Sequence, residues 1–567
     1  MPCDSTASSG KLLGDPMFEW FRTAFQRKGS SESAAGQQAP VASAYQAEEE
    51  LQQAYRLLAE GQPKQAEACC RRALQADAGA ADAHHLLGAA LRAQGRLMEA
   101  IASYRKVTAL KPDQAQSHLD MGEVLSEQGN LDEAIIAYKA AASLLPDYAE
   151  LHSNLGTLYR KRGHAGQAEA CYRKAIELKP DFHAAHFNLG NLLRNQGRLP
   201  ETEACYQAAI ACNPDLVAAH HNLGDVLKDQ GRFDEAMSCY ERALTVAPDY
   251  PASRWHQTML SLLTGDLQRG LPGYEYRWQL VKEEQPRNLK QPLWLGDADI
   301  RGKAILLYAE KGFGDTLQFV RYAGQVAALG ARVLLEVQAP LKSLLSAYPG
   351  MDKVLARGEP LPPFDYQCPL MSLPLAFKTE VATIPAASRY ISAPADRVTH
   401  WAGQLKQYRS PRIGLVWSGN IGQSNDMNRS MTLETLGALM SGSRHHFFAL
   451  VKEVREHDKA LLRSMPNVTD LSPQLTDFSE TAAILENLDL LIAVDTSVAH
   501  LAGALGKPAW IMLSFVPDWR WFTNRPDSPW YPSVRLFRQP ANNDWESVVE
   551  SLRTELDLLD GNRSGSC

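Results

Sequence analysis

The sequence predicts a helical-repeat array followed by two α/β domains of the doubly wound type, and three observations support this prediction. Glycine, tyrosine and proline recur every 34 residues between about residues 46 and 284. After residue 295, short apolar runs alternate with helical stretches, which favours parallel sheets flanked by helices. A chain of 567 residues, 45% of them hydrophobic, is also long enough to form several cores.

Each 34-residue unit contains two glycines, a tyrosine and a proline. The second glycine recurs every 34 residues from Gly61 to Gly265, and the tyrosine recurs at the same spacing from Tyr104 to Tyr274. The first glycine occupies positions Gly88, Gly122, Gly156, Gly190 and Gly224. We expect the first glycine to let two helices approach and the second to close the turn between them. Proline ends the second helix. These features are the signature of the tetratricopeptide repeat, a pair of antiparallel helices per unit.

Asparagine recurs two residues before the first glycine of the later units, as Asn154, Asn188 and Asn222. An amide both donates and accepts hydrogen bonds, so such a ladder could bind the backbone of an extended protein acceptor in the groove. The alternative is that the amides bond within the array. Histidines recur as well, from His84 to His220, but neighbouring ones are about 16–20 Å apart if helices pack 8–10 Å apart. We therefore interpret the histidines as structural.

The composition divides the chain into four segments. Residues 1–44 are rich in Ser, Ala, Gly and Gln, and we expect them to be disordered. Residues 45–284 form the array of about six to seven repeats. Residues 285–400 and 401–567 form the first and second doubly wound halves, with residues 515–532 as an aromatic loop over the second sheet.

The charge and the cysteines exclude several classes of protein. A net charge of −7 provides no basic excess for binding nucleic acid. The nine cysteines contain no CxxC pair and indicate neither a disulfide framework nor a zinc site. No apolar run of about 18 residues predicts a membrane span, and the N-terminus lacks the basic and apolar regions of a secretory signal. We therefore expect a cytoplasmic protein.

Polar residues follow several predicted strands of the second half. After the apolar strand Leu490–Val494, Thr496 and Ser497 stand where a helix begins. Free N–H groups and the positive end of the helix dipole make such a position an anion site, although a helix cap alone would also explain the hydroxyls. Other strand ends add Ser418, Asn420, Arg429 and Lys452. Hydroxyls, an amide and cations suit a diphosphate, whereas no Walker motif, complete GxGxxG or carboxylate cluster indicates an NTPase, a dehydrogenase or a metal site.

Three motifs resemble those of glycosyltransferase family nine, the heptosyltransferase-like enzymes. They are Gly314-Asp315, Trp417-Ser418-Gly419-Asn420, and the stretch from Asp495 to Ala502. The resemblance covers residues 295–560 and implies the two-domain GT-B fold, with the nucleotide sugar bound by the second half. It also implies metal-independent, inverting transfer, with no cofactor besides the nucleotide-sugar substrate. The fused array is similar in architecture to protein O-GlcNAc transferase and to bacterial flagellin glycosyltransferases.

The resemblance also implies roles for individual residues. Asp315 would be the general base, although an aspartate there could instead cap the following helix. Lys452 would contact the donor phosphates. Gly314, Asp495, Thr496, Ser497 and His500 would complete the donor site. The loop 421–430 and Trp519-Arg520-Trp521 depart from the family pattern, so the sequence does not specify the donor sugar.

The sequence therefore predicts a glycosyltransferase that modifies a hydroxyl of a protein recruited by the array. Two other functions stay open: a scaffold with an inactive transferase domain, and a transferase that acts on a glycan or a lipid carrier. The donor motif argues against the first, and the asparagine ladder argues against the second.

Overall fold

The computed structural model describes residues 38–280, 287–422 and 425–564. The chain divides into two compact units, residues 1–226 and 227–567. The division falls within α12 (Val217–Asp229), so the last repeat helices belong to the same unit as the α/β domains. Residues 1–37 of the predicted disordered segment lie outside the described residues. Residues 38–44 are helical, contrary to the prediction, because α2 begins at Gln38.

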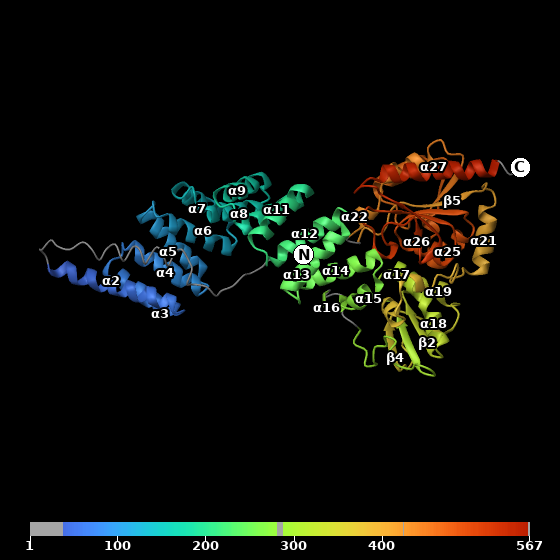
Figure 1. Ribbon diagram of the computed structural model, residues 1–567, viewed down its shortest axis with the longest axis horizontal. Helices are drawn as coiled ribbons and strands as arrows, with labels where there is room; N and C mark the ends of the chain where they lie inside the picture. The colour runs from blue at the N-terminus through green and yellow to red at the C-terminus, as the bar shows by residue number, and fades with distance from the viewer. Residues whose placement is uncertain (1–37, 281–286, 423–424, 565–567) are drawn as a thin grey trace. The chain divides into compact units, whose positions relative to one another are not determined.

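The repeat region consists of paired helices, most of them 13 or 14 residues long (Figure 1). The pairs are α2 (Gln38–Ala59) with α3 (Pro63–Ala76), α4 (Ala81–Ala93) with α5 (Leu97–Leu110), α6 (Ala115–Gln128) with α7 (Leu131–Leu144), α8 (Ala149–Lys161) with α9 (Ala165–Leu178), α10 (His183–Asn195) with α11 (Leu199–Cys212), α12 with α13 (Phe233–Val246), and α14 (Pro251–Thr264) with α15 (Leu267–Tyr274). A short helix, α16 (Arg277–Leu280), follows.

The recurring residues have the roles that their spacing predicts. A Cβ atom on Gly88, Gly122, Gly156 or Gly190 would lie 2.7–3.0 Å from the ring of the tyrosine of the same unit. The second glycines, from Gly61 to Gly265, have positive φ angles, as the turn requires. The histidines are structural: a ring nitrogen of each, from His84 to His220, lies 2.7–3.2 Å from the carbonyl oxygen six residues earlier.

The first α/β domain contains a four-stranded parallel sheet of order β3-β2-β1-β4. Its strands are β1 (Ala304–Tyr308), β2 (Arg332–Val337), β3 (Met351–Ala356) and β4 (Tyr366–Pro369). Its helices are α17 (Phe313–Phe319), α18 (Ala323–Ala328), α19 (Ala339–Leu345) and α20 (Leu373–Ala376). Every residue of β1 is buried, which explains its continuous apolar sequence.

The second α/β domain contains a seven-stranded sheet of order β10-β11-β9-β8-β5-β6-β7, in which only β10 is antiparallel. Its strands are β5 (Arg412–Val416), β6 (His446–Ala449), β7 (Val468–Asp470), β8 (Leu490–Val494), β9 (Ala509–Leu513), β10 (Asp527–Ser528) and β11 (Tyr531–Arg538). Its helices are α21 (Ala395–Leu405), α22 (Asp426–Arg429), α23 (Leu433–Met440), α24 (Glu456–Ser464), α25 (Phe478–Glu486), α26 (Ser497–Ala504) and α27 (Trp545–Ser564). Figure 1 shows this domain in orange and red and the first domain in yellow.

The predicted fold class is confirmed, and two further local predictions, both in the α/β region, are wrong. The boundary expected between residues 400 and 401 lies inside α21, which packs on α25 of the second domain and whose Trp401 donates a hydrogen bond to Glu480 (2.7 Å). The stretch 515–532, expected as a loop, contains a 3₁₀ turn at 519–521, β10 and the start of β11. None of the described helices is both long enough and apolar enough to cross a membrane.

Candidate active site at the facing strand ends

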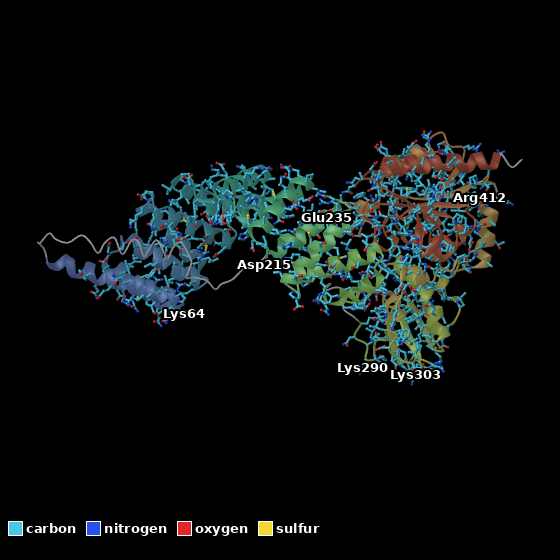
Figure 2. The ribbon with its side chains drawn as sticks, in the orientation of Figure 1. Lys64, Asp215, Glu235, Lys290, Lys303 and Arg412 are labelled. Atoms are coloured by element: carbon cyan, nitrogen blue, oxygen red, sulfur yellow. The ribbon has the colours of Figure 1, made fainter. Side chains whose placement is uncertain are left out.

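The candidate site lies where the carboxyl ends of β1 and β8 bring residues of the two α/β domains into contact. A Cβ atom on Gly314 of α17 would lie 2.7 Å from the His500 ring of α26. The rings of Phe313 and Phe478 also meet, with 5.0 Å between their centroids. Figure 2 labels Lys303 and Arg412, which stand at the opposite, amino ends of β1 and β5. Open α/β sheets bind ligands at the carboxyl ends of their strands.

Two hydroxyl groups at this edge have no hydrogen-bond partner among the described residues. Ser418 follows β5 and Thr496 follows β8, and these strands are neighbours in the sheet. The oxygen atoms Oγ of Ser418 and Oγ1 of Thr496 are both buried and unpartnered. Thr496 is the N-cap residue of α26, yet its side chain makes no capping hydrogen bond. The alternative that this hydroxyl serves as a helix cap is therefore wrong.

Arg429 adds a cation to the same strand ends. Its Nη1 lies 3.3 Å from the carbonyl oxygen of Asp495, which directly precedes Thr496. Its Nε lies 3.6 Å from the Asp426 carboxylate. Ser497 is the half-buried first residue of α26. The structure thus brings together four predicted donor residues: Ser418, Arg429, Thr496 and Ser497.

Asn420 and Lys452 each make a hydrogen bond to the protein backbone away from these hydroxyls. Asn420 is exposed, and its Oδ1 accepts a hydrogen bond from the backbone of Gly422 (2.8 Å) in a local turn. Lys452 is exposed and follows β6, the neighbour of β5, but its ammonium donates to the carbonyl of Leu475 (2.5 Å). A donor would have to draw Lys452 away from this carbonyl, and the role of each residue stays a prediction.

Asp495 and His500 stand in a buried network with altered pKa values. Burial and the neighbouring Asp518 carboxylate raise the pKa of Asp495 to about 6. Burial and the Arg520 guanidinium lower the pKa of His500 to about 3, so its ring is neutral near pH 7. The Nδ1 atom of His500 lies 2.9 Å from the Tyr531 hydroxyl, and its Nε2 lies 3.7 Å from the Asp495 carboxylate. A neutral His500 could contact a donor only through hydrogen bonding or packing.

Asp315 has two partners, one on each carboxylate oxygen. Its Oδ2 accepts a hydrogen bond from the backbone of Gly312 (2.9 Å) at the start of α17. Its Oδ1 forms an ion pair with Arg520 of the second domain. The cap alternative therefore describes one of these contacts, and the other contact places Asp315 against the second α/β domain.

Sequence reasoning did not identify Arg520 as a site residue. The segment Trp519-Arg520-Trp521 departs from the family pattern, and the structure places it in a buried 3₁₀ turn. The Arg520 side chain is only 8% exposed, and its guanidinium lies 4.7 Å from the Trp519 ring. An arginine between two tryptophans was the available signal, because aromatic neighbours favour a buried cation.

Glu310 is a second residue that the sequence did not reveal. It follows β1 and lies 2.9 Å from the Arg277 guanidinium of α16. Burial raises the pKa of Glu310 to about 8, although Arg277 opposes this shift. Arg277 is completely buried and also pairs with Glu275 (2.7 Å) and donates to Ser372 of the first α/β domain (2.8 Å). The segment that ends the repeat region thus contributes to the wall of the first α/β domain.

The asparagine ladder is not uniform. Asn154 is exposed and lines a cavity of about 240 Å³ in the first unit, with Arg92, Glu123, Ser126, Glu127, Tyr138, Thr157 and Leu158. Asn188 is half-buried. Asn222 donates to Asn191 (2.9 Å) and lies 3.4 Å from the Tyr206 hydroxyl, so its amide bonds within the array. Binding of a peptide by Asn154, Asn188 and Asn222 stays a prediction, and a structural role is visible for Asn222.

Comparison with protein families identifies both parts of the chain. The model of glycosyltransferase family 9 (heptosyltransferase) matches residues 437–513. Tetratricopeptide repeat models match residues 88–129, 113–181, 181–249 and 221–287. These matches confirm the predicted resemblance.

The chain also resembles a curated protein and several solved structures. Protein FlbA of Caulobacter vibrioides is 26% identical over 326 residues, which are 52% of this chain and 53% of FlbA, so the chain spans about half the length of the relative it matches. The crystal structure of MamA is 24% identical, with a TM-score of 0.28, covering 29% of this chain and 95% of MamA. Pseudomonas aeruginosa pilF is 21% identical, with a TM-score of 0.34, covering 38% of this chain and 98% of that one.

Proposed function

Because this chain, a distant homologue of FlbA, joins tetratricopeptide repeats to a glycosyltransferase family 9 domain, we propose that it transfers a sugar from a nucleotide sugar to a hydroxyl of a protein acceptor. The buried, unpartnered hydroxyls of Ser418 and Thr496 carry this proposal. Leaving a buried hydroxyl without a partner costs about 1–3 kcal/mol. Diphosphate oxygens at the start of α26 would accept hydrogen bonds from both.

The groups around these hydroxyls suit the departure of a diphosphate. The acceptor oxygen attacks the anomeric carbon, the bond from that carbon to the diphosphate oxygen breaks, and its electron pair leaves with the diphosphate. The carboxylate of Asp315 takes the acceptor's proton. Arg429 and the positive end of α26 stabilise the leaving group, with Lys452 when it turns from Leu475. These protein charges would do the work of a metal ion, so the proposal includes metal-independent transfer.

The repeat array supports a protein as the acceptor. Exposed Asn154 and half-buried Asn188 could bind a peptide backbone without reading its sequence. The cavity beside Asn154 also contains Glu123 and Glu127 with Arg92, so it offers both charges to a side chain of the acceptor. A glycan or lipid carrier would need no such peptide-binding surface.

Removing one hydroxyl tests the donor site. Thr496→Val keeps the shape of the side chain, and the fold should tolerate it because the hydroxyl makes no capping bond. We expect the affinity for a nucleoside diphosphate, measured by calorimetry with UDP, GDP, ADP and CDP, to fall about tenfold. Ser418→Ala should act in the same direction. The control is Thr554→Val on α27, where the exposed hydroxyl bonds to the Glu550 carbonyl (3.0 Å). Unchanged affinity in both site variants would refute the proposed donor site.

A further inference from the structure

Arg520 connects carboxylates from the two α/β domains. Its Nη2 pairs with Asp315 of the first domain, and its Nη1 lies 2.7 Å from Asp518 of its own turn. Aromatic rings from both domains face the guanidinium, Trp519 at 4.7 Å and Phe319 at 5.7 Å. The cation is therefore buried at the contact between the proposed base and the proposed donor-binding half.

The bonding of Arg520 is incomplete. Its Nε atom is buried and has no hydrogen-bond partner among the residues that the structure describes. A guanidinium has five N–H groups in a fixed plane, and buried N–H groups are normally satisfied. The Nε–H of this arginine, which is only 8% exposed, therefore remains available to a further acceptor.

The donor turn lies beside this arginine. Trp521, the next residue, stacks on His500 of α26 with 5.1 Å between ring centroids and 21° between the planes. The charge of Arg520 acts on Asp495, which directly follows β8, and on His500. The unpartnered hydroxyl of Thr496 directly follows Asp495. The same few residues thus connect Arg520 with the proposed diphosphate site.

We propose that Arg520 is a ligand of the donor diphosphate, and that in the absence of the donor it holds Asp315 in an ion pair. Guanidinium binds phosphate oxygens in the bidentate geometry that it uses with carboxylates, so a diphosphate and Asp315 compete for one cation. Donor binding draws Arg520 to the diphosphate and leaves the Asp315 carboxylate free to take the acceptor's proton. The base becomes available only when there is a sugar to transfer. This inference rests on the proposed function.

The competition has a measurable consequence. In the absence of donor, Asp315 is paired with the guanidinium in most molecules. The apparent affinity for the diphosphate is then the intrinsic affinity multiplied by the small fraction of molecules in which Arg520 is free. Asp315→Asn removes the competing charge and keeps the shape of the side chain. We expect this variant to bind the nucleoside diphosphate about tenfold more tightly than the unaltered protein. A purely structural ion pair predicts no gain in affinity.

The experiment is a double-mutant cycle by calorimetry, with UDP, GDP, ADP and CDP as probes. Arg520→Gln should weaken binding of the nucleoside diphosphate about tenfold. Adding Asp315→Asn to this variant should not change the affinity further, because Asp315 and the diphosphate no longer compete for a guanidinium. The matched control is Asp527→Asn, which breaks the exposed ion pair between Asp527 and Arg525 (2.8 Å) on the same segment and should not change the affinity.

The outcomes separate the inference from the function on which it rests. Tighter binding by Asp315→Asn that disappears in the double variant supports the inference. Equal affinities of the unaltered protein and Asp315→Asn refute it and leave the proposed function standing. An unaltered protein that binds none of the nucleoside diphosphates refutes both. If Arg520→Gln does not fold, Arg520→Met takes its place in the cycle, and an absence of gain in Asp315→Asn alone still refutes the inference.

Discussion

Gly314 and His500 touch across the contact between the two α/β domains, with the His500 ring 2.7 Å from where a Cβ atom on Gly314 would lie. Each residue belongs to one of the motifs that resemble family nine, so the two motifs meet in space. The contact leaves no room for a side chain at position 314. The close spacing of α17 and α26 at this point therefore depends on the absence of a side chain at position 314.

Gly314→Ala should push α17 and α26 apart. Overpacking of this kind costs about 1–3 kcal/mol of folding stability, and the displaced Asp315 should lower the rate of transfer. The control is Gly324→Ala in α18, where a Cβ atom would meet nothing within 4 Å. That substitution should leave the rate unchanged and stabilise the helix by about 0.5–1 kcal/mol. Thermal unfolding and initial rates of both variants check the prediction, and a stable, fully active Gly314→Ala protein would contradict it.

Asp315→Asn tests the base. An amide cannot take the acceptor's proton, so the transfer rate should fall by about 10²–10⁴. The amide oxygen can still accept the hydrogen bond from Gly312, so the start of α17 should be preserved. Single-turnover transfer at saturating donor is the measurement. A variant that transfers sugar at the original rate would show that Asp315 is only a cap and an ion-pair partner.

The buried His500 should make the fold sensitive to acid. Its pKa is about 3 in the folded protein, below the ordinary value of about 6.5 that holds in the unfolded chain. Between these pH values the unfolded chain binds the extra proton, so His500 destabilises the fold as the pH falls from 6.5 towards 3. Denaturant unfolding of His500→Gln between pH 4 and pH 7 should show a weaker pH dependence, by up to one proton. An unchanged slope would mean that His500 protonates in the folded state.

The three asparagines of the ladder should differ in the effect of their substitution: two should affect sugar transfer, and one should affect stability. Asn154→Ala together with Asn188→Ala should impair sugar transfer to a protein and leave hydrolysis of the donor unchanged, because both side chains would contact only the acceptor. Asn222→Ala should instead lower the melting temperature, because it removes the donor to Asn191. Equal loss of transfer and hydrolysis in the first variant would indicate structural damage and remove the ladder from the acceptor site.

Arg277 should be required for stability. Arg277→Met leaves the carboxylates of Glu275 and Glu310 without their guanidinium, and breaking a buried pair from one side costs about 3–5 kcal/mol. Adding Glu275→Gln removes one uncompensated charge and should recover part of the loss. Chemical unfolding of the single and double variants gives the comparison. No recovery in the double variant would mean that packing of Arg277 on Tyr274 and Trp278 dominates.

The features that the sequence predicted correctly are those encoded by local patterns. The period of 34 residues determines the helix pairs, and continuous apolar runs determine strands such as β1 and β8. Thr496 and Ser418 could be placed at the ligand-binding edge because a parallel sheet brings its strand ends together. Their lack of partners could not be predicted, since it depends on every neighbouring side chain.

Residues that pair across long stretches of sequence were missed. Arg520 meets Asp315, and Arg277 meets Glu310, through contacts between elements that no periodicity connects. Lys452 and Asn222 fit a binding pattern in the sequence, but the structure gives each a partner within the protein. A local sequence pattern shows which groups a side chain could bind. It does not show whether another group of the protein already occupies that side chain.

The division of the chain within α12 separates the repeats that could vary in number from the last repeat, which is fixed to the α/β domains. Helices α15 and α16 are tied to the transferase by the hydrogen bond from Gln268 to Glu380 and by the buried Arg277, so the last repeat behaves as a fixed adaptor. The repeats that precede α12 form their own compact unit. Under the proposed function, units of 34 residues could be added, deleted or exchanged upstream of the adaptor, which would alter the acceptors recruited and leave the catalytic groups in place. Substrate choice and catalysis can diverge independently in such a protein.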